Sequence, residues 1–526
     1  MTYTRKDLWK LPSGWNDTLL WYARAITKMQ ERAITDPSSW RYLAAIHGFD
    51  ENIWREFGYL GPEEPLPTNT HGQWRQCQHQ SWYFLPWHRG YLTAFETAVR
   101  ATIEGLPGQP PSDWALPYWD YSSSNNQVRT LPSPFTDPTT PDGEPNPLFS
   151  GRRFGIDGDG KIELDPADVA LNALDEPDFF GSGTGGGTGF GGPETGFSHF
   201  GDQSANGQLE SRPHNGVHVL VGGWRQGTDP NDPLNLGLMT NPDTAGLDPI
   251  FWLHHANIDR LWETWRARSP QHANPADNAW LTGPSPRHFV MPMPGNQTWT
   301  YAAKDVLDTR AAPLNYVYED LLETQAGAPS AVHVVRATPE AVSVATARRS
   351  AVAKRRAELM GANDSLVLLQ GAHTETTVQL EPTVTNKLAR RSASAAASVT
   401  GGAAAVPDRV YLNLENIRSS SDAAAFYVYV NLPDDADPAR HSERLAGLVS
   451  LFGVRKASHA DDAHAGNGIN EVFDITHIID SLQASDPAAL DTLSVRFVPR
   501  SKKQVESGPQ PEVSVGRVSV YREEQQ

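Results

Sequence analysis

Residues 77–89 of this chain read Cys-Gln-His-Gln-Ser-Trp-Tyr-Phe-Leu-Pro-Trp-His-Arg and place two histidines, His79 and His88, around an aromatic segment. More histidines follow downstream, in His-Asn-Gly-Val-His at 214–218 and in Asp-Pro-Ile-Phe-Trp-Leu-His-His at 248–255. Carboxylates are nearly absent from all three segments. Imidazole suits zinc, copper, iron and nickel, whereas carboxylate and water suit harder ions. The sequence therefore predicts that two soft or borderline metal ions are bound.

The spacing of these histidines limits how helices can present them. His214 and His218 are four residues apart, so on a helix both side chains lie on one face. The adjacent histidines at 254–255 share an apolar helix, and helical phase alone does not decide which of them faces a metal. His79 and His88 are nine residues apart, which turns them to opposite faces of one helix. We therefore expect His79 to precede a helix whose first turn carries His88.

The composition is that of a soluble, acidic globular protein. The 526 residues carry a formal net charge of -18, hydrophobic residues make up 39%, and the mean hydropathy is -0.48. This acidity argues against nucleic-acid binding, which needs a positive surface, and no apolar run is long enough to span a membrane. The first ten residues lack the apolar core of a secretory signal, so we expect a cytoplasmic protein, with secretion by another route left open. A single cysteine, Cys77, excludes an intramolecular disulfide.

The chain divides by composition into three parts. Residues 1–340 show helical periodicity and long proline-rich loops, and residues 341–406 are rich in Ala, Ser and Arg. In residues 407–526, apolar and polar residues alternate with a period of two. We predict a catalytic helical domain, a partly flexible linker in which residues 351–359 are compatible with a helix, and a C-terminal β domain. The glycine-rich residues 181–196 favour a mobile surface loop that is placed to act as an entrance flap. Helices are expected at 17–33, 36–48 and 86–99, from 211, and at 249–267, and strands at 410–414, 425–430, 493–498 and 513–518.

Two longer patterns contain these histidines. The first is His79-x4-Phe84-Leu85-Pro86-Trp87-His88-Arg89-x2-Leu92-x3-Glu96, and the second is Asp248-Pro249-x-Phe251-Trp252-x2-His255-x3-Asp259. They resemble the two copper-site signatures of tyrosinases, catechol oxidases and molluscan haemocyanins, which are type-3 dinuclear copper proteins, and the similarity covers residues 15–310. The segment 209–218 looks most like the plant polyphenol oxidase version, and residues 471–474 weakly resemble the plant C-terminal domain. The chain is therefore similar to a bacterial tyrosinase or polyphenol oxidase with a plant-like C-terminal region.

The resemblance implies a fold and a set of ligands. The fold would be mainly α, with a four-helix bundle core that carries the dinuclear copper site, long ordered loops, and a C-terminal all-β sandwich or barrel-like domain. The resemblance selects His255 over His254, and it favours His47 over His71 because His47 lies at a helix end. The six implied ligands are His47, His79 and His88 for the first copper ion and His214, His218 and His255 for the second.

Three further features bear on reactivity. Family members with Cys-x-His at this place carry a thioether bond from the sulfur to the histidine ring, and Cys77 and His79 have that spacing; a free thiol is the alternative. Glu210 and Asn215 resemble the pair that holds a deprotonating water in members that hydroxylate monophenols. Plant members carry a phenylalanine thirteen residues before the last ligand, where this chain has Pro242, so we expect a more open entrance.

The function that the resemblance implies is that of a copper oxidoreductase. It would use O₂ to hydroxylate monophenols to o-diphenols and to oxidise o-diphenols to o-quinones. The alternatives are a catechol oxidase or an o-aminophenol oxidase without monophenolase activity and, in a different class, a haemocyanin-like O₂-binding protein. A zinc hydrolase is disfavoured, because no carboxylate base lies within a His-Glu-x-x-His motif. The C-terminal β domain either shields the site until a protease cuts the linker, for example at the Arg pairs 348–349 and 390–391, or serves in packing or homo-oligomer formation.

Overall fold

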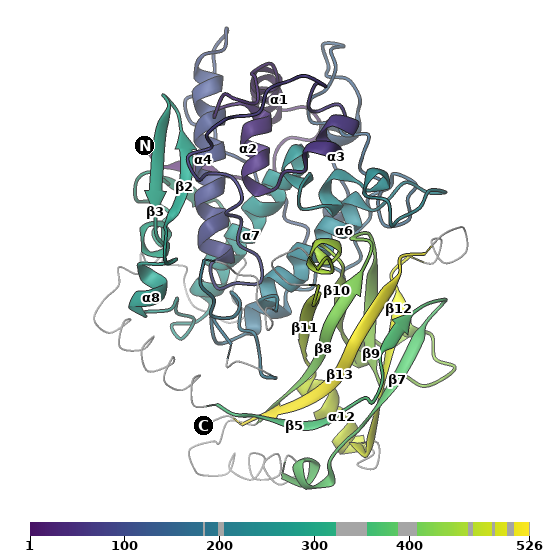
Figure 1. The fold of residues 1–526 in the computed structure, drawn as a ribbon. Helices are drawn as coiled ribbons and strands as arrows, with labels where there is room; N and C mark the ends of the chain where they lie inside the picture. The colour runs from purple at the N-terminus through teal and green to yellow at the C-terminus, as the bar shows by residue number, and fades with distance from the viewer. Residues whose placement is uncertain are drawn as a thin grey trace.

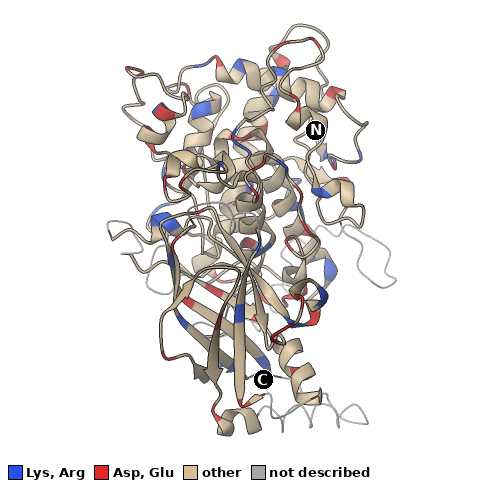
Figure 2. Ribbon diagram, turned by 90° about the vertical axis from the view of Figure 1, so that its right-hand side faces the viewer, with Lys and Arg blue, Asp and Glu red and all other residues tan. Residues whose placement is uncertain are grey.

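The chain folds into a helical part and a β-sandwich that pack against each other (Figure 1). The computed structural model describes residues 1–181, 185–197, 205–321, 355–387, 408–460, 466–485, 490–501 and 510–524. Acidic and basic residues are dispersed over both parts rather than gathered in a basic stripe (Figure 2). In the described part of the chain, no helix has the length and apolar character needed to cross a membrane.

Several helices of the N-terminal part begin at side-chain caps. The Asn16 side chain accepts a hydrogen bond from the Leu19 N–H at the start of α1, and the Asp248 side chain accepts one from the Ile250 N–H at the start of α7, where Pro249 occupies the first helical position. The predicted helices are confirmed with small shifts of their ends. The helices are α1 Asp17–Gln30, α2 Trp40–His47, α3 Glu51–Glu56, α4 Phe84–Glu104, α5 Ser133–Thr136, α6 Gly216–Gly222, α7 Pro249–Arg268, α8 Asn278–Leu281, α11 Val454–Ala457 and α12 Thr476–Ser485.

Four helices, α2, α4, α6 and α7, surround the centre of the helical part (Figure 1). Most residues of α4 and α7 are buried on every side, and the rings of Phe95 and Trp252 stack between these helices with centroids 3.5 Å apart. Buried aromatic pairs of this kind contribute both apolar burial and ring–ring attraction. The four-helix core expected from the resemblance is confirmed.

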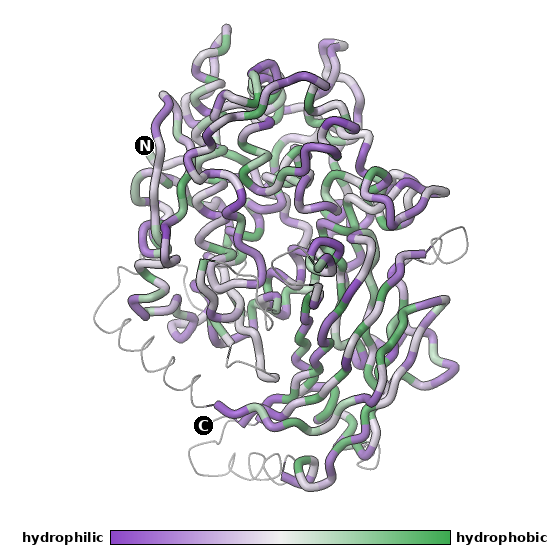
Figure 3. Tube along the Cα trace, viewed as in Figure 1, coloured by the Kyte–Doolittle hydropathy of each residue, from purple (hydrophilic) through white to green (hydrophobic). Residues whose placement is uncertain are grey.

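The C-terminal part is a sandwich of two antiparallel sheets. One has the strand order β10-β9-β12-β7, and the other has the order β11-β8-β13-β5, with β6 also paired to β13. Apolar and polar residues alternate along several of its strands (Figure 3), as expected for strands with one face in a core. The strands are β1 Tyr3–Arg5, β2 Phe289–Met293, β3 Gln297–Tyr301, β4 Tyr316–Tyr318, β5 Ala357–Ala362, β6 Val367–Leu369, β7 Thr374–Gln379, β8 Arg409–Ser419, β9 Ala425–Val430, β10 Leu445–Ser450, β11 Ile469–Asp474, β12 Thr492–Pro499 and β13 Val513–Glu523.

Two expectations from the sequence need correction. The linker prediction for residues 341–406 is wrong over 357–379, where β5, β6 and β7 join the two sheets. The helix considered for 351–359 is wrong over 357–359, which belong to β5, and residues 351–354 lie outside the described residues. The rest of that stretch lies largely outside the described residues. The glycine-rich segment was expected at the surface, yet residues 185–192 are buried. A Cβ on Gly185 or Gly187 would meet the rings of Tyr521 or Tyr411, so glycine allows the β-sandwich to approach this segment closely.

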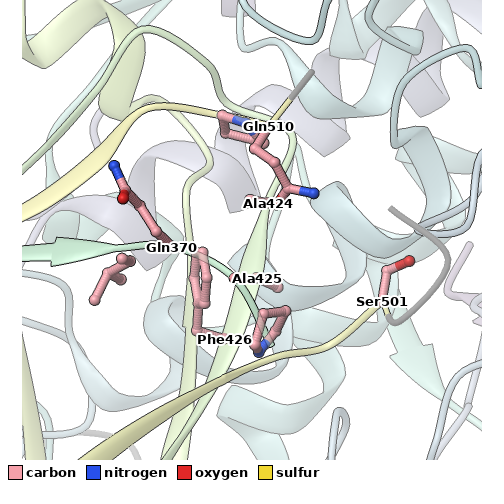
Figure 4. A pocket seen from close by; sticks show the side chains of 10 residues that line it. Gln370, Ala424, Ala425, Phe426, Ser501 and Gln510 are labelled. Carbon is pink, nitrogen blue, oxygen red and sulfur yellow. The ribbon is translucent and has the colours of Figure 1, made fainter. Parts of the chain in front are cut away.

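A small pocket lies in the sandwich, at its border with the helical part. It is lined mainly by β-domain residues, including Gln370, Phe426, Ser501 and Gln510 (Figure 4). The Ser501 hydroxyl donates a hydrogen bond to Asp157 of the helical part, at 2.6 Å. No charged or metal-binding side chain lines this pocket.

Candidate metal centre

The four core helices and one loop bring the six predicted histidines together. His47 is the last residue of α2, His88 lies in the first turns of α4, His218 lies in α6 and His255 lies in α7. His79 lies in the loop before α4, as its spacing from His88 predicted. His214 lies in a π-helical turn, Glu210–Asn215, that leads into α6.

The first histidine group contains His47, Cys77, His79 and His88. The atoms that these residues could offer to a metal all lie within 4.8 Å of one another. The Nε2 atoms of His47 and His79 are 3.4 Å apart, and the Cys77 sulfur lies 3.8 Å from His88 Nε2. The group therefore converges on one point.

The second group contains His214, His218, His254 and His255, whose ligand atoms also lie within 4.8 Å of one another. The Nε2 atoms of His218 and His255 are 3.3 Å apart. The two groups face each other, because the rings of His88 and His255 stack with centroids 4.6 Å apart and an interplanar angle of 14°. The histidines thus form one site with two centres.

Hydrogen bonds at the outer ring nitrogens turn the Nε2 atoms inward. Five of the six Nδ1 atoms lie within hydrogen-bond distance of an oxygen, and since a carbonyl oxygen cannot donate, the proton sits on Nδ1 at the backbone contacts. Such contacts fix the tautomer and orientation of a metal-binding imidazole. The contacts are His47 with the Pro242 carbonyl at 2.9 Å, His79 with Glu210 at 2.9 Å, His88 with the Phe84 carbonyl at 2.8 Å, His214 with Asn215 Oδ1 at 2.8 Å, and His218 with the Met239 carbonyl at 2.9 Å.

This arrangement fits a pair of soft or borderline cations. Where each ring carries its proton on Nδ1, two lone pairs face each other across the 3.4 Å between His47 and His79, which is unfavourable unless a cation lies nearby. His214 Nε2 is buried with no hydrogen-bond partner. Burial chiefly lowers the pKa of both His47 and His79 to about 3, so the rings are neutral and able to bind a metal. All-nitrogen donor sets suit copper or zinc better than magnesium or calcium.

The alternatives among the histidines are also placed by the structure. His71 is exposed and contacts Asn69, away from both groups. His254 is buried beside the second group; its Nδ1 lies 3.3 Å from the hydroxyl of Tyr121, and its ring packs against those of His214, His218 and His255. His255, in contrast, faces both groups.

Glu210 and Asn215 lie in the same turn of the chain, and each contacts a different histidine group. The Glu210 carboxylate is buried, contacts His79 Nδ1 and accepts the Gln80 N–H at 2.9 Å, and burial chiefly raises its pKa to about 8. Asn215 contacts His214 of the second group. The two side chains thus each touch one predicted ligand.

One residue at the site was not expected from the sequence. Phe452 follows β10 in the C-terminal domain, and its ring lies 4.1 Å from the ring of His218, with an interplanar angle of 17°. Its centroid also lies 5.8 Å from those of His79 and His214. The next residue, Gly453, lies beside Pro242, whose position was expected to leave the entrance open. The β domain therefore places an aromatic ring over the histidines, and no local sequence pattern indicates this.

Several ion pairs join the β domain to the helical part. In each such pair within the described part of the chain, the cation lies on the C-terminal side and the carboxylate lies in the helical part. Arg500 pairs with Asp168 at 3.0 Å, where the Tyr427 hydroxyl also donates to Asp168 at 2.6 Å. The remaining pairs are Arg500 with Asp165, Arg409 with Glu176, Arg355 with Asp178 and Lys456 with Asp243.

Comparisons with known proteins agree with this geometry. A model of the common central domain of tyrosinase matches residues 37–162 and 184–268, and a model described as a domain of unknown function (DUF7868) matches residues 356–523. The chain is 34% identical over 535 residues to the tyrosinase HcTyr1 of Hahella sp. (strain CCB-MM4), with 99% of each chain covered. The chain belongs to the tyrosinase family. A tyrosinase-family relative, the chloroplastic polyphenol oxidase of Malus domestica, is 26% identical over 57% of this chain and 46% of its own.

Solved structures of tyrosinase-family proteins share the fold of both domains. The structure of latent apple tyrosinase has a TM-score of 0.59 at 18% identity and covers 99% of this chain and 97% of its own. The structure of recombinantly expressed latent aurone synthase has a TM-score of 0.59 at 17% identity and covers 100% of this chain and 90% of its own. The protein is therefore an enzyme of the tyrosinase and polyphenol oxidase family, and its two histidine groups are fit for a pair of copper ions.

Proposed function

We propose that this protein is a tyrosinase-type oxidase that hydroxylates monophenols to o-diphenols and oxidises o-diphenols to o-quinones with O₂. In this proposal His47, His79 and His88 hold one copper ion, and His214, His218 and His255 hold the other. Copper ions bound there would relay electrons from the substrate to O₂, two for each catechol that is oxidised to a quinone. The chain contributes the geometry of the ligands, the binding of the ring and the handling of the proton.

The observation that carries the proposal is the Phe452 ring against His218. A phenylalanine ring is a phenol that lacks only the hydroxyl group, and it lies flat on this imidazole at 4.1 Å. Offset stacking of two rings at this separation is favourable. When the β domain withdraws, the same space is free for the ring of a phenol or catechol, with its oxygen directed at the two histidine groups.

Proton removal is assigned to Glu210 and Asn215. A free phenol has a pKa near 10, as tyrosine does, so hydroxylation near neutral pH needs a group that accepts the phenol proton. The Glu210 carboxylate and the Asn215 amide flank His79 and His214, the rings of which are 5.6 Å apart. We assign to them the orientation of a water that accepts this proton.

Cys77 is assigned a covalent role. Its sulfur lies in the first histidine group, within 4.8 Å of the ring nitrogens of its members. A bond from this sulfur to a ring carbon of His79 removes one hydrogen from each partner and passes two electrons to O₂. The bond would keep the His79 ring from rotating, in addition to its hydrogen bond to Glu210.

The β domain is assigned a shielding role. Phe452 covers the histidines, and the ion pairs described above hold the domain in place. Two solved structures that share the whole fold, those of apple tyrosinase and aurone synthase, are of latent proteins. A protease that cuts the chain between the domains, or any treatment that weakens the interface, would then open the site.

The test is turnover by the full chain loaded with copper. O₂ uptake and product absorbance are measured with 4-methylphenol and with 4-methylcatechol, for the wild type and for Phe452→Ala. Turnover of both substrates supports the proposal. Turnover of the catechol alone would replace it with a catechol oxidase, and reversible O₂ binding with no turnover in either protein would indicate an O₂ carrier.

A further inference from the structure

Asp243 holds a carboxylate at a fixed position beside the first histidine group. It follows Pro242, whose carbonyl oxygen contacts His47 Nδ1. The Asp243 N–H donates to Asn241 Oδ1 at 3.0 Å, and its carbonyl accepts the Trp54 Nε1–H at 2.7 Å. Hydrogen bonds at both ends of this residue fix its backbone, so its side chain does not depend on the β domain for its placement.

The β domain presents a cation to this carboxylate. Lys456 Nζ lies 3.2 Å from Asp243 Oδ1, and the lysine side chain is 50% exposed whereas that of Asp243 is 9% exposed. The other charged pair nearby, Arg455 with Asp422, lies within the β domain. Burial is the main cause of the lowered pKa of His47, but Asp243 and Lys456 also act on it, in opposite directions. Both charges therefore lie next to the contact between Pro242 and His47.

Lys456 and Phe452 come from one short segment, four residues apart. The segment places a benzene ring on His218 and an ammonium group on Asp243. A ring and an ammonium joined by a short chain are also the two parts of an arylalkylammonium ion. The segment 452–456 thus presents to the site the same two groups, an aromatic ring and an ammonium group, as such a molecule would.

We propose that Asp243 binds the ammonium group of the substrate, so that the enzyme prefers phenols and catechols with a cationic amine side chain. This rests on the proposed function, because it assumes that a phenol ring takes the place of Phe452. A carboxylate on the substrate would be repelled by Asp243, and a neutral substrate would gain nothing from it. A partly exposed ion pair supplies a preference of up to roughly fivefold over a neutral substrate, and repulsion of an anion adds a similar factor.

The alternative is that the pair of Lys456 and Asp243 only helps to dock the domain. A half-exposed ion pair contributes little to docking, so this reading predicts no effect of Asp243 on substrate choice. The two readings predict different substrate preferences for a full-chain enzyme that lacks both the Phe452 ring and the Lys456 ammonium group. Phe452→Ala/Lys456→Ala provides that background.

The experiment compares three catechols in this copper-loaded background: cationic 3,4-dihydroxyphenethylamine, neutral 4-methylcatechol and anionic 3,4-dihydroxyphenylpropionate. We expect kcat/KM for the cation to exceed that for the anion by about tenfold or more. Asp243→Asn should bring the ratio close to one, mainly through KM, and Asp243→Glu should retain much of it. Asp142→Asn, which removes an exposed charge elsewhere, should leave the ratio unchanged. Ratios within each variant are compared, so a change in overall activity does not affect the result.

Binding provides a readout that does not depend on turnover. Calorimetry gives the Kd of phenethylammonium and of 3-phenylpropionate for the same holoenzymes. Tighter binding of the cation that is lost in Asp243→Asn supports the proposal. Equal binding of the two ions in the background, or a preference that survives Asp243→Asn, would overturn it. Absence of turnover with all three catechols would instead contradict the proposed function, and the binding result would still decide the role of Asp243.

Discussion

The ring of Phe452 lies flat against the ring of His218, with 4.1 Å between centroids and 17° between planes. The two residues belong to different domains, and the contact joins the β-sandwich to the centre of the helical core. In the proposed function, a phenol ring takes the place that Phe452 occupies here. The accessibility of the histidines therefore depends on how firmly the β domain is docked.

Removing this ring should activate the full chain. Phe452→Ala removes a buried side chain whose burial stabilises the docked domain by about 2–3 kcal/mol, and it frees the space on His218. We expect kcat/KM for 4-methylcatechol to rise by about tenfold or more, since each 1.4 kcal/mol is a factor of ten. Phe149→Ala, at an exposed phenylalanine of the helical part, serves as the control. A lower melting temperature without any gain in activity would show that Phe452 is only a packing residue.

The docking of the β domain should weaken as the pH rises. Glu471 of β11 is buried, accepts hydrogen bonds from Ser211 at 2.8 Å and from Asn206 at 2.5 Å, and has its pKa raised from 4.5 to about 7, chiefly by burial. Because the folded pKa lies above the unfolded value, the folded state binds this proton more tightly. The resulting stability is fully present below pH 4.5 and is lost as the pH rises through 7, by about 3 kcal/mol.

Glu471→Gln should therefore flatten the pH dependence of the unfolding free energy between pH 4.5 and 7.5. The pKa of Glu176 is also raised to about 7, chiefly by burial, so it adds a slope of the same sign and some dependence should persist. Denaturant unfolding of the wild type and the variant at several pH values measures both slopes. Identical slopes would mean that Glu471 does not carry a tightly held proton.

Monophenol hydroxylation should depend on Asn215 more than catechol oxidation does. Asn215→Ala removes one of the two groups assigned to the proton-accepting water, and positioned proton transfer contributes about 10²-fold or more. We expect the ratio of kcat/KM for 4-methylphenol to that for 4-methylcatechol to fall by about that factor. Copper content is measured alongside, because Asn215 also contacts His214. An unchanged ratio at full copper content would remove Asn215 from the mechanism.

The thioether is testable by mass. After exposure of the copper-loaded chain to O₂, the denatured protein should weigh two hydrogens less than its sequence, and a peptide that links Cys77 to His79 should be found. Cys77→Ser should show its full sequence mass. A wild-type mass equal to the sequence value, with a titratable thiol, would mean that the bond does not form.

Much of this site follows from local sequence. Helical spacing places His214 and His218 on one face, and the separation of nine positions between His79 and His88 predicts a loop before α4, as the structure shows. These features can be predicted from the sequence because each depends only on the helical repeat within one segment. The choice between His254 and His255 needed the resemblance, since both lie on the same buried helix.

Other parts depend on tertiary contacts that a sequence does not display. Phe452 lies in a Leu-Phe-Gly stretch of a β-rich region and reads as ordinary core. The polar strand β7, Thr374–Gln379, lies at a sheet edge, where β12 is its partner strand among the described residues. Its apolar and polar residues alternate only weakly, so the sequence alone does not distinguish it from a linker. Asp243 and Lys456 are 213 residues apart, and only the packed domains bring them together.

Copper stoichiometry tests the central claim most directly, because the account rests on two metal ions held by six particular histidines. Copper is measured per chain, after removal of loosely bound metal, in the wild type, His255→Asn and His254→Asn. We predict two copper ions in the wild type, one in His255→Asn and two in His254→Asn. A wild type that holds a single copper ion, or a His254→Asn variant that loses copper while His255→Asn keeps both ions, would contradict the account.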